Sequence, residues 1–275
     1  MAPMSERSDP IVQTYSRLAE QYDDDRNIGS CWGLAAKEAV ARIALRESYK
    51  VVVDLGCGTG GALCELAAVA PPSTVFVGIE PAENMRRLAE QRNKKFQNVT
   101  ILNGRFEKIP LDQDSTDYLY SIMAFHWATD LERSVEELAR VLKSDGELDL
   151  FFIGRWNGRE FVTKTTPIFR KYLGLLGLLK AAKLRKQLSH QEALALFSQQ
   201  FEPSRLSVEE SYRTYYDTID GHWGWWVRIE GQFLNMPTER VAACERDVRA
   251  ALVEMETPKG IPYTLHELHV RLRQS

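Results

Sequence analysis

The stretch Val51–Gly61, VVVDLGCGTGG, is an apolar run that breaks abruptly into glycine at four of its last six positions. Three β-branched residues followed by so much glycine predict a buried strand and a loop whose backbone comes close to a ligand. Residues 62–69 have helical propensity and few helix breakers, so the loop should lie between a strand and the N-terminus of a helix. Free N–H groups and the helix dipole favour anionic or polar ligand groups there.

A second apolar run, residues 74–79, ends in Glu80, twenty residues after Gly60. An acid at the tip of the second strand is placed to hold a ribose diol. A nicotinamide-dependent oxidoreductase would show the same order of strand, glycine turn, helix, strand and acid. However, the segment from Gly56 to Gly60, GCGTG, lacks the third glycine of GxGxxG, and Asp54 precedes it. These two details argue against a nicotinamide enzyme.

The motif DLGCGTG, followed by an acid at Glu80, resembles the first two motifs of class I S-adenosylmethionine (SAM) dependent methyltransferases. The resemblance covers residues 15–153. It implies that the glycine loop packs under the amino-acid part of SAM and that Glu80 holds the ribose hydroxyls. The implied cofactor-binding residues are Tyr22, Asp54, Gly56, Cys57, Gly58, Gly60, Glu80, Pro81, Met85, Arg105, Phe106 and Ser121.

The same resemblance implies an α/β fold: a seven-stranded, mostly parallel, Rossmann-like sheet with helices on both faces and an antiparallel final strand. The expected organisation is one domain over residues 1–275. Residues 11–153 would form its cofactor-binding core. Residues 154–202 and 217–258 would form helical substrate lids, inserted after the fifth and sixth strands.

Two segments of the core carry more specific expectations. YSRLAEQYDDDR resembles the segment that lies over the SAM pocket, with Tyr22 approaching the methionine carboxylate and Tyr15 packing or touching cofactor. A helix over residues 81–93 would hold Pro81 in its first turn and turn Met85 toward the adenine. Arg105 stands where many relatives have an aspartate that accepts a bond from adenine, and arginine has no acceptor. We therefore expect Phe106 and nearby backbone to hold the adenine, and Arg105 to point to solvent.

The composition limits the class of protein. With 275 residues and 44% apolar content the chain can bury a full core. A net charge of −3 implies no global attraction to nucleic acid. The four cysteines show neither paired nor metal-type spacing, so a reducing cytoplasm and no bound metal are expected. No apolar run reaches the roughly 20 residues that span a bilayer, so stable membrane insertion is not expected.

Residues 114–123 predict a fourth strand that runs into AFHW, residues 124–127. Ligands of open α/β sheets lie outside the carboxyl ends of the strands. AFHW is similar to the strand end of methyltransferases that esterify small acids, such as the trans-aconitate, malonyl-carrier-protein and juvenile hormone acid enzymes. We expect His126 and Trp127 to line the active site, with His222 as a second candidate base. Alternatively, His126 caps a helix and Trp127 belongs to the core.

Residues 155–187 contain nine lysines and arginines against one acid, Glu160. This imbalance predicts an anionic partner: a substrate carboxylate, a phosphate or an acidic carrier protein. Leucines at positions 173–179 lie beside the cations, as in a lid over an apolar pocket or a basic helix on a membrane surface. The lid is favoured. The tryptophans of residues 223–226 form either a wall for the substrate or part of the core.

Together these features predict methyl transfer to a small molecule, most simply an apolar acid methylated on a carboxylate that Arg155, Arg159 or Arg170 holds. Methylation of carbon, nitrogen or a hydroxyl in a molecule with a separate anionic group is the alternative. A SAM-binding protein without catalysis and a nucleic-acid methyltransferase are less favoured, and AFHW replaces the Asn/Asp-Pro-Pro-aromatic signature of the latter. His266 and His269 are three apart on a predicted strand, so they face opposite sides and are expected to be structural.

Overall fold

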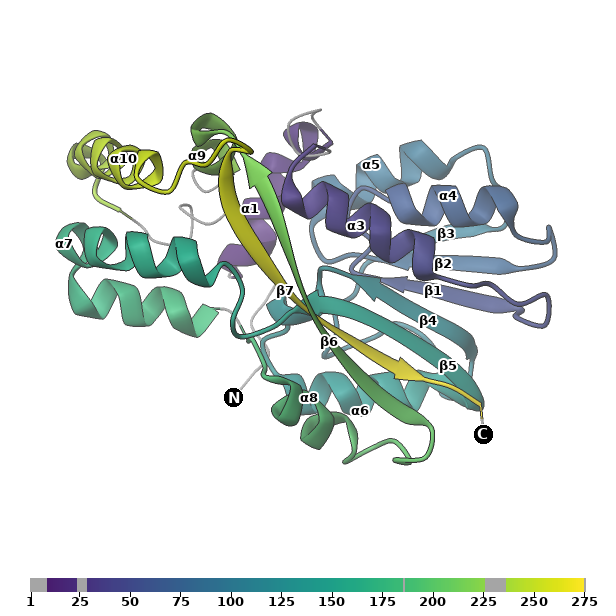
Figure 1. Cartoon of the computed structure of the whole chain (residues 1–275). Coiled ribbons are helices and arrows are strands. Elements are labelled where there is room, and N and C mark those ends of the chain that lie inside the picture. Colours follow the sequence, from purple (N-terminus) through teal and green to yellow (C-terminus); the bar gives the residue numbers. More distant parts are fainter. Residues whose placement is uncertain (1–8, 24–28, 185, 226–235, 275) are drawn as a thin grey trace.

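The computed structural model describes residues 9–23, 29–184, 186–225 and 236–274, and these residues build a sheet with strand order β3-β2-β1-β4-β5-β7-β6 (Figure 1). The strands are β1 Val51–Leu55, β2 Val75–Ile79, β3 Val99–Leu102, β4 Thr116–Ile122, β5 Leu142–Ile153, β6 Leu206–Asp217 and β7 Ile261–Leu272. Strands β1 to β5 pair in parallel, whereas β7 is antiparallel to both β5 and β6. The predicted seven-stranded, mostly parallel sheet with an antiparallel final strand is confirmed.

Helices cover both faces of this sheet (Figure 1). They are α1 Pro10–Tyr22, α3 Cys31–Arg42, α4 Gly61–Val69, α5 Glu83–Asn93, α6 Leu131–Val141, α7 Arg159–Leu184, α8 His190–Phe197, α9 Ile219–Trp225 and α10 Thr238–Val253, with a short 3-10 turn, η2, at Phe125–Trp127. The alternation of β1 explains the two layers. Val53 and Leu55 join the cluster that α6 and α8 cover, whereas Val52 packs against Leu63 of α4 on the opposite face.

The sequence predicts a helix over residues 32–46, a helix over residues 81–93 and a turn over residues 143–146, and the structure differs at one boundary of each. Helix α3 ends at Arg42 because Ile43 adopts an extended conformation. Helix α5 begins at Glu83, so Pro81 precedes the helix instead of lying in its first turn. Strand β5 begins at Leu142, before the predicted turn over residues 143–146.

Because β5 begins at Leu142, residues 143–146 form a bulge where β5 pairs with β4. Thr116 and Tyr118 of β4 pair with Leu142 and Glu147 of β5, so residues 143–146 have no register partners. The Lys143 ammonium lies 2.6 Å from the Asp117 carboxylate on β4 and holds the bulge against the sheet. The residues expected to form a turn therefore lie within strand β5, as its bulge.

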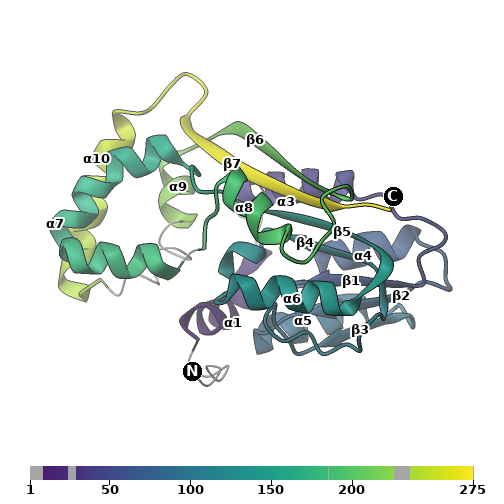
Figure 2. The same ribbon diagram turned by 90° about the horizontal axis from the view of Figure 1, so that it is seen from below.

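The helical segments after β5 pack together beyond the sheet. Phe161 and Phe169 of α7 join Val248 and Leu252 of α10 in one buried cluster that includes part of β7. Figures 1 and 2 show α7 and α10 lying side by side at one end of the molecule, with α7 sharply bent. The bend is at Gly174, whose φ is 69° and ψ 174°. Among the described residues, no helix is long and apolar enough to cross a membrane.

Candidate functional site

The glycine loop after β1 meets Glu80 at the carboxyl ends of the strands. Leu55 pairs with Ile79, so the residues that follow each strand lie side by side. The Gly58 N–H donates to Glu80 Oε2 at 3.0 Å, and the Ala82 N–H donates to Glu80 Oε1 at 2.9 Å. Burial raises the pKa of Glu80, while these two N–H groups oppose the shift. Each carboxylate oxygen can accept a further hydrogen bond, so Glu80 can also hold hydroxyls of a ligand.

Glycine is required in this loop for two reasons. Gly56, Gly58 and Gly60 have φ values of 77°, 55° and 74°, in the left-handed region. In addition, a Cβ at Gly56 would lie 2.5 Å from the Ala124 Cβ, and one at Gly60 would lie 3.0 Å from the Ala89 Cβ on α5. Gly60 thus packs against a helix and, unlike Gly56 and Gly58, lines neither cavity described below.

Two adjoining cavities surround the loop. The smaller, of about 110 Å³, reaches Glu80, Pro81, Met85 and Phe106. The larger, of about 660 Å³, reaches Asp54, Cys57 and His126. Both are lined by Tyr15, Tyr22, Gly56, Gly58, Ile122, Met123 and Trp127. Because of these shared residues, the two cavities are neighbours on either side of common walls.

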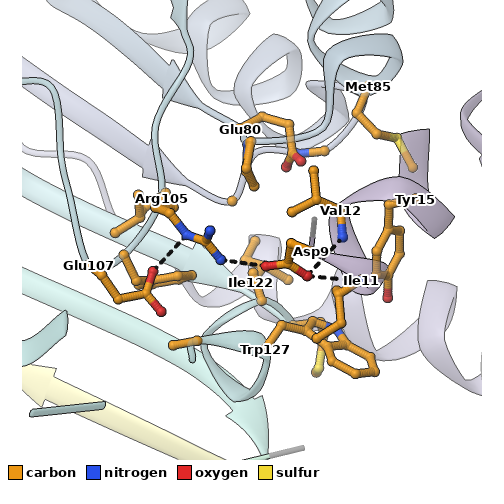
Figure 3. Close-up of a pocket in the computed structure, with 18 of the residues that line it drawn as sticks. Asp9, Ile11, Val12, Tyr15, Glu80, Met85, Arg105, Glu107, Ile122 and Trp127 are labelled. Atoms are coloured by element: carbon orange, nitrogen blue, oxygen red, sulfur yellow. Dashed lines mark hydrogen bonds and ion pairs between the residues drawn. The ribbon is translucent and has the colours of Figure 1, made fainter. Parts of the chain in front are cut away.

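The N-terminal end of α1 is fastened over the smaller cavity. The Asp9 carboxylate accepts the Ile11 N–H at 2.9 Å and also lies 2.6 Å from the Arg105 guanidinium (Figure 3). Arg105 contacts Glu107 at 3.0 Å on its other side. The expectation that Arg105 points to solvent is wrong. Its side chain lines the smaller cavity, where it forms ion pairs with Asp9 and Glu107.

Asp9 and Glu107 are cavity residues that the sequence reasoning did not single out. From the sequence alone, residues 1–10 are predicted only to be a polar segment, and Asp9 lies in it. The signal for it was Asp9-Pro10 ahead of an apolar periodic run, which is typical of a helix N-cap followed by proline. Glu107 gave no separate signal, since its partners lie far away along the chain.

The C-terminal end of α1 is held over the larger cavity. The Thr59 hydroxyl donates to Asp23 at 3.0 Å, and Arg92 of α5 forms an ion pair with the same carboxylate. Between the two ends, the Asn84 amide donates to the Ser16 carbonyl at 2.9 Å. Burial, with the charge of Asp23 and Glu80 adding to it, raises the pKa of Tyr22 to about 12, so its hydroxyl stays neutral. Helix α1 therefore forms a fixed roof over the site.

The end of β4 forms the opposite wall. Met123 has a φ of 54°, unusual for a residue with a side chain, and directs the chain into η2. His126 is only 2% exposed and lines the larger cavity, while Trp127 lines both cavities. The Trp127 ring lies 6.0 Å from the Tyr15 ring of the roof, so wall and roof meet.

Two predicted site residues lie elsewhere. The Ser121 hydroxyl donates to the Leu55 carbonyl at 2.6 Å and joins β4 to β1 without lining either cavity. His222 packs between Phe161 and Tyr263, and its Nε2 lies 3.0 Å from the Ile261 carbonyl. The structure therefore does not bring His222 to the site as a second base.

The predicted anion-binding arginines are also absent from both cavities: Arg155, Arg159 and Arg170 line neither. Arg155 instead lies 2.6 Å from Glu192 of α8. Acids distant in sequence pair with other cations of α7 in the same way: Lys164 with Glu254, and Lys171 with Asp247. Of the remaining calls, Arg185, Trp226 and the side chains of Lys183, Trp223 and Trp225 lie outside what the structure describes.

The two strand histidines have separate partners. His266 Nδ1 accepts the Trp156 N–H at 2.9 Å, and His269 Nε2 lies 2.6 Å from Asp149. Within the described part of the chain, no cluster of three or more histidine, cysteine or acidic side chains could hold a metal ion.

The segment that builds this site matches a known family. A family profile described as "Methyltransferase domain" matches residues 53–150, which run from the strand before the glycine loop to β5. Over these residues the chain carries a SAM-dependent methyltransferase domain. Its cofactor is accordingly SAM.

Relatives and solved structures agree with this assignment. The methyltransferase is 31% identical over 133 residues to an uncharacterized methyltransferase-like protein of Schizosaccharomyces pombe, a match that spans 48% of this chain and only 47% of the relative. It is 28% identical to the uncharacterized methyltransferase YcgJ of Bacillus subtilis, over 67% of this chain and 68% of YcgJ. It is also 28% identical to the ubiquinone/menaquinone biosynthesis C-methyltransferase UbiE of Citrifermentans bemidjiense, over 62% and 71%. The crystal structure of YcgJ shares the fold, with a TM-score of 0.59 over 88% of this chain and 99% of YcgJ at 18% identity.

The residues of the site suit SAM. The loop presents backbone N–H groups beside a buried carboxylate at Glu80, which suits a ribose diol. Met85 and Phe106 give the smaller cavity apolar walls for a purine, and Asp54 offers the larger cavity a carboxylate for an ammonium group. We infer that these residues hold the adenosine and the methionine part respectively, with Tyr22 above the latter.

The Asp9 clasp leads to a first prediction. Asp9→Ala should weaken SAM binding about five- to thirtyfold, because loss of the N-cap and of the Arg105 contact costs about 1–2 kcal/mol and loosens the roof. Isothermal titration calorimetry measures the effect. The matched control is Glu20→Ala, which removes an exposed ion pair between the same helix and Arg87 and should change affinity less than about threefold. Equal effects of the two variants would contradict a special role for Asp9.

The buried Asp54 leads to a second prediction, on pH. Burial raises its pKa to about 8, so the ligand-free protein holds a proton there at neutral pH that the unfolded chain, with a pKa of 3.8, does not. Protonated Asp54 therefore stabilises the folded protein relative to the unfolded chain. This stabilisation is fully present below pH 3.8 and is lost as the pH rises to 8. A cationic ligand group favours the carboxylate, so SAM binding should release a proton. SAM affinity should rise up to about tenfold per unit between pH 6 and 7.5.

Calorimetry in buffers of different ionisation enthalpy measures this proton release directly. Below pH 7.5 the α-amino group of SAM remains mostly protonated and contributes little to the slope. Asp54→Asn should abolish both the slope and the proton release. A pH-independent affinity in the wild type would show that Asp54 does not face the ammonium group.

Proposed function

We propose that this methyltransferase transfers the methyl group of SAM to a small, largely apolar molecule. The observation that carries the proposal is the larger cavity beside the glycine loop. Its volume of about 660 Å³ is typical of small-molecule sites, and Trp32, Met123, Trp127 and Ile153 give it apolar walls. These walls suit an apolar body better than a nucleic acid, and the chain's net charge of −3 agrees.

Bound SAM supplies an electrophilic methyl group. The task of the protein is then to hold the acceptor atom near it and to exclude water. Trp127, which lies under the roof helix beside Tyr15, would position the acceptor from one side. His126 lines the same cavity and is nearly inaccessible to solvent, so it could accept a proton from the acceptor or orient the acceptor through a hydrogen bond.

Two acceptor classes follow from these residues. A carboxylate is ionised near neutral pH and needs no base, which makes an apolar acid the simplest acceptor. A carbon acid, amine or hydroxyl would need a base, and His126 supplies a candidate. The cavity is lined by His126 but not by Arg155, Arg159 or Arg170, so we favour the second class. The name of the relative UbiE, a C-methyltransferase, also supports it.

An acceptor panel with a matched pair of histidine variants tests both points. S-adenosylhomocysteine formation is measured with apolar acids, their neutral amides, phenols and β-dicarbonyl compounds. If the acceptor loses a proton, His126→Gln should lower kcat/KM at least about 100-fold, whereas a carboxylate acceptor should be little affected. His190 lies on α8, outside the site, and its ring is hydrogen-bonded to the Val208 carbonyl of β6. His190→Gln should therefore leave kcat/KM unchanged for both classes of acceptor. SAM binding without turnover of any small acceptor, or turnover only of bulk tRNA or DNA, would contradict the proposal.

A further inference from the structure

Helix α7 carries an exposed apolar surface after its bend. Leu175, Leu176 and Leu179 are 57%, 76% and 50% exposed, whereas Leu178 is partly buried against the cluster formed with α10 and β7. Their spacing of i, i+1 and i+4 places the three exposed leucines within about 100° of the helix circumference. We name Leu175, Leu176 and Leu179 the leucine face.

The leucine face does not cover the cofactor site. Of the residues that the structure describes, none from α7 lines either cavity. A lid over an apolar pocket would turn its leucines inward, but here the inward positions are filled by Phe161, Phe169 and Leu178. Figure 2 shows the second half of α7 at the outer edge of the molecule. An exposed apolar patch at such a position marks an interaction surface.

Three cations lie on or beside α7: one before its bend, one after it and one on α10. Arg170 and Lys180 are exposed and form no ion pair within the described part of the chain. Exposed Arg240 of α10 donates to the Tyr172 carbonyl at 2.9 Å, which adds a third cation close to the bend. Residues 161–189 contain no aspartate or glutamate. Glu254 and Asp247 of the neighbouring segment pair with Lys164 and Lys171, so the positive charge near the leucine face is that of Arg170, Lys180 and Arg240.

We propose that the leucine face, with Arg170, Lys180 and Arg240, docks on an anionic lipid bilayer. A helix with apolar residues beside cations lies in the plane of a membrane interface, with its apolar side chains at the acyl boundary and its cations among the headgroups. A second copy of the chain would bring the same cations and repel the first. Such docking is peripheral and requires no membrane-spanning helix. It goes beyond the proposed methyl transfer and does not depend on it.

Vesicle sedimentation with the full chain tests the proposal. The wild type should bind vesicles of phosphatidylcholine mixed with phosphatidylglycerol, and bind less to phosphatidylcholine alone or at high salt. The triple variant Leu175→Ser, Leu176→Ser, Leu179→Ser should partition at least about tenfold less to the mixed vesicles. The double variant Arg170→Gln, Lys180→Gln should bind the mixed vesicles less than the wild type does, whereas its binding to vesicles of phosphatidylcholine alone should not change. Val69→Ser changes an equally exposed apolar residue on α4, 78% exposed, and should bind like the wild type.

Three outcomes would overturn the proposal. The first is that the wild type does not bind the mixed vesicles. The second is that the triple leucine variant binds them as well as the wild type. The third is that sedimentation velocity shows a wild-type dimer that is absent in the triple leucine variant. SAM calorimetry confirms that each variant is folded, which is expected because the replaced side chains are exposed. The vesicle assay contains neither SAM nor an acceptor, so its failure is distinct from a failure of methyl transfer.

Discussion

Gly56→Ala should destabilise the protein by about 2–5 kcal/mol, from two separate causes. About 1–2 kcal/mol comes from the left-handed backbone, in which φ is 77°. A further 1–3 kcal/mol or so comes from overpacking, because the new Cβ would lie 2.5 Å from the Ala124 Cβ. The Ala124 Cβ is attached directly to the backbone and cannot rotate away. Chemical denaturation in urea measures the loss.

Gly58→Ala is the matched control for the effect of crowding. Gly58 has a similar left-handed φ of 55°, but no heavy atom lies within 4 Å of the position where its Cβ would stand. This variant should lose only the backbone term of about 1–2 kcal/mol. Equal losses in the two variants would show that the strand end at Ala124 yields freely to the loop.

Glu80→Ala should weaken SAM binding by about 1.5–3 kcal/mol, or roughly 10- to 150-fold, because a charged acceptor for the ribose hydroxyls is lost. The Gly58 and Ala82 N–H groups lose their acceptor in the same variant, so the loop itself becomes less ordered. Calorimetry on the folded variant gives the affinity.

Two further variants show which property of Glu80 matters. Glu80→Gln keeps the shape but replaces one acceptor oxygen with a donor that faces an N–H group, so it should lose nearly as much affinity as alanine. Glu90→Ala on the exposed side of α5 removes a carboxylate without touching the site and should bind SAM normally. Unchanged affinity in folded Glu80→Ala would place the cofactor elsewhere.

The cofactor half of the fold could be predicted because its signals are local. β1, the glycine loop and Glu80 occupy one short stretch. The sequence also predicts a third strand over residues 99–102, and β3 has these bounds. Parallel strands buried on both faces read as uninterrupted apolar runs, so the sequence marks their positions directly. Met85, Phe106 and Trp127 lie in the cavity walls, in agreement with what the family resemblance implied for them.

The part of the chain after β5 was harder to predict because its contacts join distant residues. The count of nine cations against one acid in residues 155–187 suggested an anion site, but Glu192, Asp247 and Glu254 pair with three of those cations from outside the window. Asp9 was missed for the same reason, since Arg105 lies 96 residues away along the chain. A linear charge count cannot include partners that only the tertiary fold supplies.

The antiparallel insertion of β7 between β5 and β6 has a consequence for how the chain folds. Leu148 and Ile153 of β5 pair with Leu272 and Glu267, so the sheet is completed by a strand made more than a hundred residues after its neighbour. Until β7 arrives, β6 has no partner and β5 is an open edge that invites pairing with other chains. During synthesis strands β1 to β5 can assemble first. The pairings of β7 form later, because they join residues far apart in the sequence and require the closure of long loops. The emergence of β7 from the ribosome, rather than cofactor-site formation, thus sets the earliest moment at which this sheet can close.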